Sequence, residues 1–329
     1  MAATRPVFAF DTVSLPRRLA LRFSVNHRQE PASMKRQTSV AAFGCNTYSY
    51  ALSHPAEDCL THLASLGFSE FEVMMVPSHL WPPDISLAAR KTLRRRIDKL
   101  GAGVVALNMP NVDMNVAGLA PEMRRYTLDL LNGIVELAGD LGVPGVVIGP
   151  GKANPLFPAS KDRLVDHFFT ALDELCPRAE KVGTELWVEN MPFAFLPKIG
   201  ELMDALDRYG NPGIGIVWDA ANSHFAHEDL GQSLRRCRER LKLVHLSDTN
   251  RWRSRHDAVG LGTVPFAEIP AILAEIGYDR RAILEVISHD ADRDILASAQ
   301  RLTEKGFAAP ARKDKRVKSR KVRAADKLG

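Results

Sequence analysis

Four ionisable side chains recur at nearly regular spacing in the second half of the chain. Glu189, Asp219, His245 and Glu285 each end a short apolar run, and they are separated by 30, 26 and 40 residues. A carboxylate at the end of a buried strand is costly unless it is paired, protonated or bound to a metal ion. Three carboxylates and one imidazole are mostly hard ligands, which favour Mn²⁺ or Mg²⁺ and leave Co²⁺ or Zn²⁺ open. The spacing therefore predicts a site for one divalent metal ion.

Such a site needs a scaffold that brings the ends of several strands together. Short runs rich in Val and Ile alternate with amphipathic stretches, as expected for helices and for strands that are buried on both faces. Proline near the start and glycine just past the end mark the expected helices. The expected strands are residues 41–46, 71–76, 103–109, 145–149, 185–190, 213–219, 242–248 and 282–287.

Eight strand–helix units in about 270 residues are typical of an α/β protein with a single (β/α)8 TIM-barrel domain. A doubly wound sheet would need fewer strands, and no glycine-rich phosphate loop follows the first strand. The glycine-rich segment 149–155 follows the fourth strand instead. In TIM barrels the chemistry takes place at the C-terminal ends of the strands. Further polar candidates at or beyond those ends are Glu72, His79, Asn108, Asn190 and Asp248.

Composition and charge exclude several other classes of protein. The chain has 329 residues, 45% hydrophobic and 25% charged, and its four cysteines form no CxxC pair. No apolar run reaches the roughly 18–20 residues of a membrane span, and scattered cysteines favour a reducing compartment, so we expect a cytoplasmic protein. The net charge is +5, but residues 1–40 carry +5 and residues 309–329 carry +7, which leaves −7 for the body. An acidic body argues against specific nucleic-acid binding.

The two ends of the chain differ from its body. We expect residues 1–40 to form a flexible N-terminal extension, residues 41–308 the catalytic barrel, and residues 309–329 a basic disordered tail. The Arg-rich, acid-poor start also suits a transit peptide. Whether translation starts at Met1 or at Met34 stays open.

Over about residues 41–305 the chain resembles the xylose-isomerase-like TIM barrels of sugar (phosphate) isomerases and epimerases. The resemblance implies one divalent metal ion held by four residues at the ends of strands five to eight. It also implies that Glu189 and Glu285 are catalytic, one removing a proton from carbon and the other returning it on the opposite face. A metal-bound carbonyl would stabilise the cis-enediolate that this step forms. The motifs are WVENMP with Glu189, VWDAANSH with Asp219, VHLSDTNR with His245, ILEV with Glu285, and a glycine-rich loop over residues 256–266.

Other polar residues are expected to contact the substrate. The resemblance implies such a contact for Arg251, six residues after His245, and Trp252 can stack on the face of a sugar. The sequence departs from the family where members often carry a histidine, here Asn222, and where the epimerases carry an acid, here Phe195. The expected substrate-binding residues are Arg251, Asn222, Asn108, His256, Trp252 and Glu72.

The sequence thus predicts a metal-dependent isomerase or epimerase of a small, unphosphorylated sugar or keto-polyol. A lyase on the same barrel stays open, acting on an inosose, a dehydroshikimate-like compound or a 3-keto-glycoside by the same proton abstraction. An AP-endonuclease-like phosphodiesterase is disfavoured, because Asn108, Asn222 and Arg255 stand where its three-zinc cluster needs further ligands. The substrate, the carbon acted on, the physiological metal and association into a homo-oligomer are left open.

Overall fold

The computed structural model describes residues 39–109 and 113–310. These residues all belong to one compact unit, Ser33–Gly329. The predicted N-terminal extension, apart from its last two residues, and the predicted tail beyond residue 310 lie outside the described residues.

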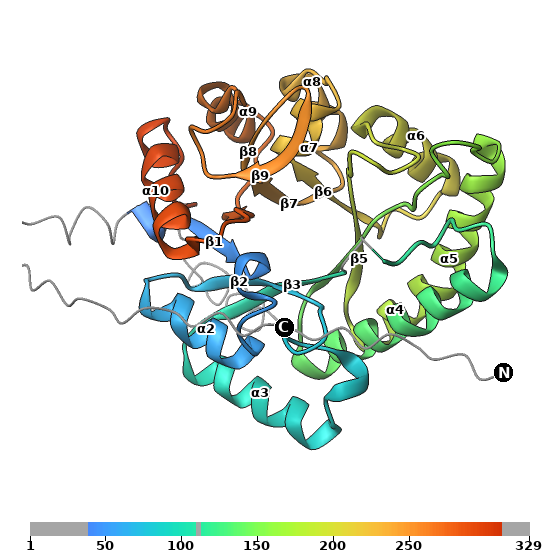
Figure 1. The fold of residues 1–329 in the computed structure, drawn as a ribbon, viewed down its shortest axis with the longest axis horizontal. Coiled ribbons are helices and arrows are strands. Elements are labelled where there is room, and N and C mark those ends of the chain that lie inside the picture. Colours follow the sequence, from blue (N-terminus) through green and yellow to red (C-terminus); the bar gives the residue numbers. More distant parts are fainter. Residues whose placement is uncertain (1–38, 110–112, 311–329) are drawn as a thin grey trace, which may run out of the picture. The chain divides into compact units, whose positions relative to one another are not determined.

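Eight parallel strands form a closed barrel in the order β1-β10-β7-β6-β5-β4-β3-β2 (Figure 1). The predicted (β/α)8 TIM barrel is therefore confirmed. Each predicted strand is present but is shorter than predicted by one to three residues at one end, and β2 and β7 begin one residue earlier than predicted. The strands are β1 (Phe43–Asn46), β2 (Glu70–Met74), β3 (Gly103–Asn108), β4 (Gly145–Ile148), β5 (Glu185–Glu189), β6 (Gly215–Asp219), β7 (Leu241–Leu246) and β10 (Ala282–Leu284).

Helices follow the strands and surround the barrel (Figure 1). The longest two end as the sequence predicts, because Gly142 and Gly183 adopt the left-handed conformation that terminates a helix without a Cβ clash. Within the two described ranges, every helix is too short or too polar to span a bilayer. The helices are α2 (Ala56–Ser65), α3 (Leu87–Lys99), α4 (Pro121–Leu141), α5 (Lys161–Val182), α6 (Ile199–Tyr209), α7 (Ala220–Phe225), α8 (Leu230–Cys237), α9 (Ile269–Glu275) and α10 (Ala291–Glu304), with short 3₁₀ turns η1 (Tyr48–Tyr50), η2 (Pro82–Asp84) and η3 (Phe266–Glu268).

The apolar core has two parts, one between the barrel and its helices and one inside the barrel. Trp187 is the largest side chain inside the barrel and is 1% exposed. A Cβ at Gly145 or Gly215 would lie within 2.6 Å of its ring, so glycine on both neighbouring strands makes room for the indole. The interior cluster is Ala106, Val147, Trp187, Val217, Leu243 and Ile283.

An antiparallel hairpin follows β7 and was not predicted. Its strands are β8 (Asp248–Asn250) and β9 (Arg253–Asp257), and both contact α7. Apart from Trp252, the sequence of this segment is polar, and it shows no alternation of apolar and polar residues. The hairpin returns the chain toward the C-terminal ends of the barrel strands, where His256 of β9 lies beside Glu285.

Candidate metal centre and active-site cavity

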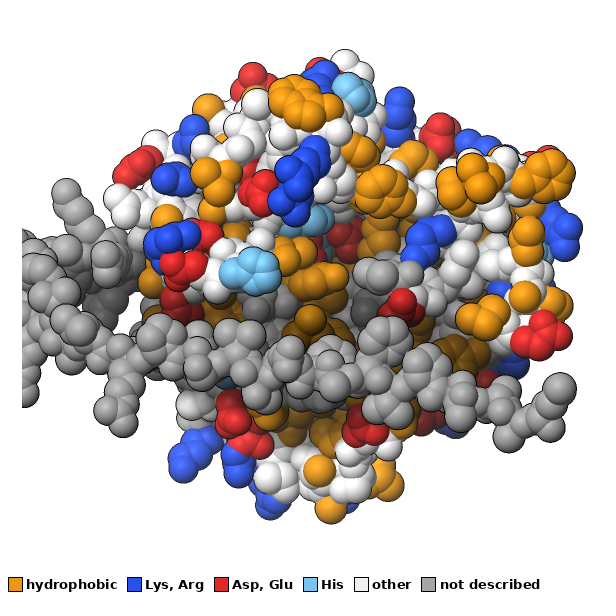
Figure 2. Space-filling model, in the orientation of Figure 1, with side chains coloured by type: hydrophobic (Ala, Val, Ile, Leu, Met, Phe, Trp, Pro, Cys, Tyr) orange, Lys and Arg blue, Asp and Glu red, His pale blue; other side chains and the backbone are white. Residues whose placement is uncertain are grey.

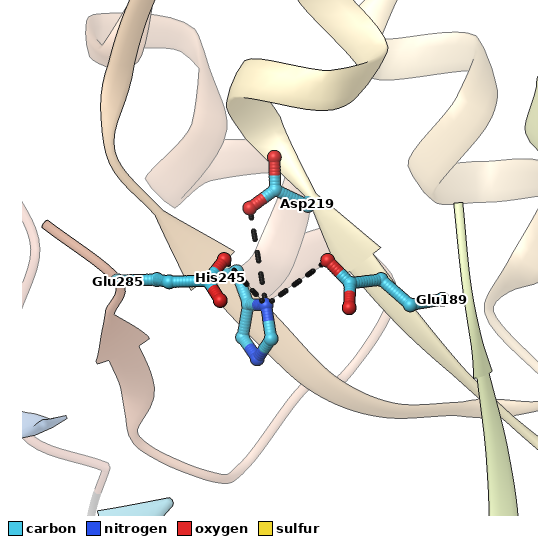
Figure 3. Close-up of side chains that lie close together, drawn as sticks. All are labelled: Glu189, Asp219, His245 and Glu285. Atoms are coloured by element: carbon cyan, nitrogen blue, oxygen red, sulfur yellow. Dashed lines mark ion pairs between the residues drawn. The ribbon is translucent and has the colours of Figure 1, made fainter. Parts of the chain in front are cut away.

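Neighbouring strands bring the four predicted metal ligands to one place. Glu189 and Asp219 are the last residues of β5 and β6. His245 lies one residue before the end of β7 and pairs in register with Asp219, while Glu285 directly follows β10. One ligand atom from each residue lies within 4.8 Å of the other three, and the side chains point toward one another (Figure 3).

The Nδ1 atom of His245 faces all three carboxylates. It lies 3.4 Å from Oε1 of Glu189, 3.8 Å from Oδ2 of Asp219 and 3.2 Å from Oε2 of Glu285. This nitrogen, Oδ2 of Asp219 and Oε2 of Glu285 are buried without a hydrogen-bond partner. A buried polar atom without a partner costs about 1–3 kcal/mol. A divalent cation bound among these atoms would satisfy them together, so the residues present fit the predicted metal.

The protonation of the carboxylates also favours a cation. Burial, followed by repulsion from Glu285, raises the pKa of Glu189 to about 8. Burial likewise raises the pKa of Asp219 to about 6. Burial acts in the same direction on Glu285, but His245 and His256 outweigh it and lower the pKa of Glu285 to about 2. The protein alone thus holds the cluster partly protonated, and a bound cation would favour full ionisation.

Two further predicted residues join the cluster. The side-chain amide of Asn222 donates to Oε1 of Glu189 at 3.3 Å, and its backbone N–H donates to Asp219 at the start of α7. The Nδ1 atom of His256, from β9, lies 3.3 Å from Oε2 of Glu285 and 2.9 Å from Oγ of Ser247. Asn222 orients one predicted catalytic carboxylate, and His256 lies against the other.

A cavity of about 410 Å³ opens over the metal-ligand cluster. In Figure 2, acidic and histidine side chains are visible in a recess between apolar side chains. Of the predicted residues, Glu189, Glu285, Asn108, Asn222 and His256 line the cavity. Gly149, Gly151 and Lys152 of the glycine-rich segment 149–155, which the sequence suggests as a loop lining the site, also line the cavity. Sequence reasoning missed Tyr48 and Ser254 and the apolar wall of Met74, Met109, Met114, Val116, Met191, Pro192, Phe193 and Ala194.

Three predicted substrate contacts do not line this cavity. Arg251 and the 78% exposed Trp252 form the tip of the β8–β9 hairpin. Glu72 is fully buried, and its Oε2 atom lies 2.8 Å from Nε2 of His245. Substrate contacts from Glu72, Arg251 and Trp252 therefore remain predictions.

Two other residues singled out in the sequence have structural positions. His79 bonds to Oγ1 of Thr47 and to the carbonyl of His54, and burial lowers its pKa. Phe195, at the position where epimerases carry an acid, packs its ring against Phe168 rather than lining the cavity. Neither side chain is placed to contact a substrate.

The closed parallel barrel defines a TIM barrel, and its polar cluster lies at the C-terminal strand ends, where TIM-barrel active sites are found. The model of the Xylose isomerase-like TIM barrel family matches residues 60–306. The chain belongs to this family.

Individual relatives are more distant. The fructoselysine 3-epimerase of Shigella flexneri is 21% identical over 242 residues, which cover 71% of this chain and 86% of the relative. The solved structure of a D-tagatose 3-epimerase-like protein is 23% identical, with a TM-score of 0.69 over 80% of this chain and 96% of that chain. That of a 3-keto-D-glucoside 4-epimerase from E. coli is 18% identical, with a TM-score of 0.66 over 79% and 98%. At these identities the solved structures show a shared fold.

Proposed function

We propose that the protein is a divalent-metal-dependent isomerase or epimerase of a sugar or keto-polyol. The observation that carries the proposal is the pair of carboxylates Glu189 and Glu285, which lie on opposite sides of the metal-ligand cluster (Figure 3). Both side chains line the cavity. Two carboxylates so placed can act on opposite faces of one carbon. Relatives named as 3-epimerases and 4-epimerases of keto sugars support the same class of reaction.

In this mechanism one glutamate takes the proton from the carbon beside the substrate carbonyl. The other delivers a proton to the opposite face of that carbon, which inverts it, and delivery to the neighbouring carbon would instead isomerise the sugar. Asn222 holds Glu189 in position through its amide N–H. A cation held by Glu189, Asp219, His245 and Glu285 would supply positive charge for the oxygen that becomes negative during the reaction.

The remaining features of the proposal follow from the donor set and the cavity. Mn²⁺ or Mg²⁺ suits three carboxylates and one imidazole best. The substrate is a small molecule, because the cavity has the size of a small-ligand pocket, about 300–1,000 Å³. A cytoplasmic location and an unphosphorylated substrate stay predictions from the sequence.

Hydrogen–deuterium exchange tests the proposal directly. The full chain is incubated with Mn²⁺ in D₂O and a panel of ketoses, inososes and 3-keto-glycosides, and proton NMR follows deuterium bound to carbon. We expect deuterium beside the carbonyl together with a new stereoisomer or an aldose–ketose pair. Glu189→Gln and Glu285→Gln should each lower the rate by about 10²–10⁴-fold, as for loss of a general acid or base.

The exposed Glu239 provides a matched control, because it precedes β7 and pairs with the neighbouring Arg238. Glu239→Gln should therefore leave the rate unchanged. Loss of water or of an aglycone would instead identify the lyase. If the metal-loaded protein exchanges no carbon-bound hydrogen in any compound, the proposed chemistry is wrong.

A further inference from the structure

Glu72 is a carboxylate buried inside the barrel that the proposed reaction does not use. It lies in β2, is 0% exposed and does not line the cavity. Its Oε1 atom accepts a hydrogen bond from Nδ2 of Asn108 at 3.0 Å, and its Oε2 atom accepts one from Nδ2 of Asn46 at 2.7 Å. Both oxygens therefore act as acceptors. A carboxylate is seldom buried this completely without a specific partner.

That partner is His245, the imidazole of the metal-ligand cluster. Its Nε2 atom lies 2.8 Å from Oε2 of Glu72, while Nδ1 faces the other three carboxylates. Neither ring nitrogen has an aligned hydrogen-bond partner among the described residues. At 2.8 Å, Oε2 of Glu72 is within hydrogen-bonding distance of Nε2 and needs only a better alignment with the ring N–H.

We infer that Glu72 is a positioning residue for the metal site. This inference rests on the proposed function. By accepting a hydrogen bond from the N–H of Nε2, it leaves the lone pair of Nδ1 for the cation and fixes the orientation of the ring. A neutral imidazole carries one N–H and one free lone pair, so the partner of one nitrogen decides which nitrogen binds a metal. The carboxylate also raises the basicity of the ligand nitrogen.

The same network reaches the predicted catalytic pair. Nδ2 of Asn46 lies 3.4 Å from Oε1 of Glu285 as well as 2.7 Å from Glu72, and Oδ1 of Asn46 accepts from the backbone N–H of Tyr48. Asn46, Glu72 and Asn108 come from the adjacent strands β1, β2 and β3. Residues of β1, β2 and β3 thus support metal ligands that come from the strands β5, β6, β7 and β10.

Metal affinity tests this inference apart from activity. Titration calorimetry with Mn²⁺ compares the full-length wild type with Glu72→Gln, which keeps the shape but turns an amide N–H toward groups that need an acceptor. We expect about 10–100-fold weaker binding, the usual effect of removing such a partner. Glu70→Gln is the matched control. It lies on the same strand and pairs with Arg281 away from the cluster, so its affinity should equal that of the wild type.

Equal Mn²⁺ affinity of Glu72→Gln and wild type would overturn the inference. If Glu72→Gln does not fold, nitrogen-15 NMR of the wild type loaded with Zn²⁺ decides instead, because it reports which ring nitrogen is protonated. We expect a proton on Nε2 of His245, and a proton on Nδ1 would contradict the inference. A wild type that binds no divalent cation would overturn the proposed metal site itself, together with this inference.

Discussion

Glu189 couples the stability of the protein to pH. Its pKa in the folded protein is about 8, whereas an unfolded glutamate has a pKa of about 4.3. Protonation of Glu189 therefore stabilises the folded state. This contribution to stability is complete below about pH 4.3 and is lost as the pH rises through about 8. Asp219, raised to about 6, acts in the same direction. We expect the cation-free protein to unfold at a lower temperature at about pH 9 than at about pH 6, as measured by differential scanning calorimetry.

Added Mg²⁺ should remove most of this difference, because it replaces the proton between the carboxylates and binds only the folded state. Glu189→Gln cannot titrate, so its cation-free form should show a weaker fall in stability over the same range. An unfolding temperature that is equal at both pH values in the cation-free wild type would contradict the role given to Glu189.

At the scale of single residues, the four metal ligands could be predicted because each lies at or next to the end of a buried strand, one barrel unit after the last. Glu72 lies in the middle of β2, and the sequence does not show whether such a side chain reaches the cavity or is buried inside the barrel. Asn46 ends β1 by the same rule and was not singled out. Its role depends on contacts with Glu72 and Glu285 that only the folded barrel creates.

Among the elements, the β8–β9 hairpin depends on one buried carboxylate. Asp248 is 2% exposed and accepts the backbone N–H groups of Thr249, Gly260 and Val264 at 3.0, 2.7 and 3.1 Å. Asp248→Asn turns an N–H donor toward one of these donors, so we expect a loss of about 1–3 kcal/mol in the free energy of unfolding. Urea unfolding measures the loss, and the carbon-exchange rate should fall with it because β9 carries His256.

A substitution at Gly262 tests the anchoring of the same hairpin by adding a methyl group instead of changing a charge. A Cβ there would lie 2.2 Å from the carbonyl oxygen of Thr249, a backbone atom that cannot move aside cheaply. We therefore expect Gly262→Ala to destabilise the protein in urea. Gly200→Ala is the control, because a Cβ added at Gly200 in α6 would meet nothing within 4 Å, and alanine there should stabilise by about 0.5–1 kcal/mol. A Gly262→Ala protein as stable as the wild type would show that the loop is not anchored in this way.

This hairpin also shows where prediction from the sequence fails at the scale of elements. The barrel strands are runs of apolar residues buried on both faces, and such runs can be recognised without knowing their neighbours. Residues 248–257 are polar apart from Trp252, and Asp248 anchors them by accepting hydrogen bonds from N–H groups up to 16 residues away. Tertiary contacts, and no local pattern, specify this element.

At the scale of the whole molecule, the barrel closes within the described residues. β1 pairs with β10, so the first and last strands of the barrel meet. The segment after α10 contributes to this closure, because Phe307 is 6% exposed and its ring centroid lies 6.0 Å from that of Phe43 in β1. The alternation of strands and helices made this architecture predictable, because eight such units leave few other arrangements.

Truncation tests where the folding unit ends. We expect a protein of residues 39–310 to bind Mn²⁺ with the affinity of the full chain, since every strand and every metal ligand is kept.

Ending the chain at residue 304 removes Phe307 and should cost about 3–5 kcal/mol in the free energy of unfolding, the range for deleting a buried phenylalanine. The full-length Phe307→Ala protein should show most of the same loss, which separates the missing ring from the missing backbone. Urea unfolding of the four proteins measures these differences. If the 39–310 protein does not fold, residues outside this range belong to the barrel's folding unit, and its boundaries extend beyond the strand–helix units that the sequence marks.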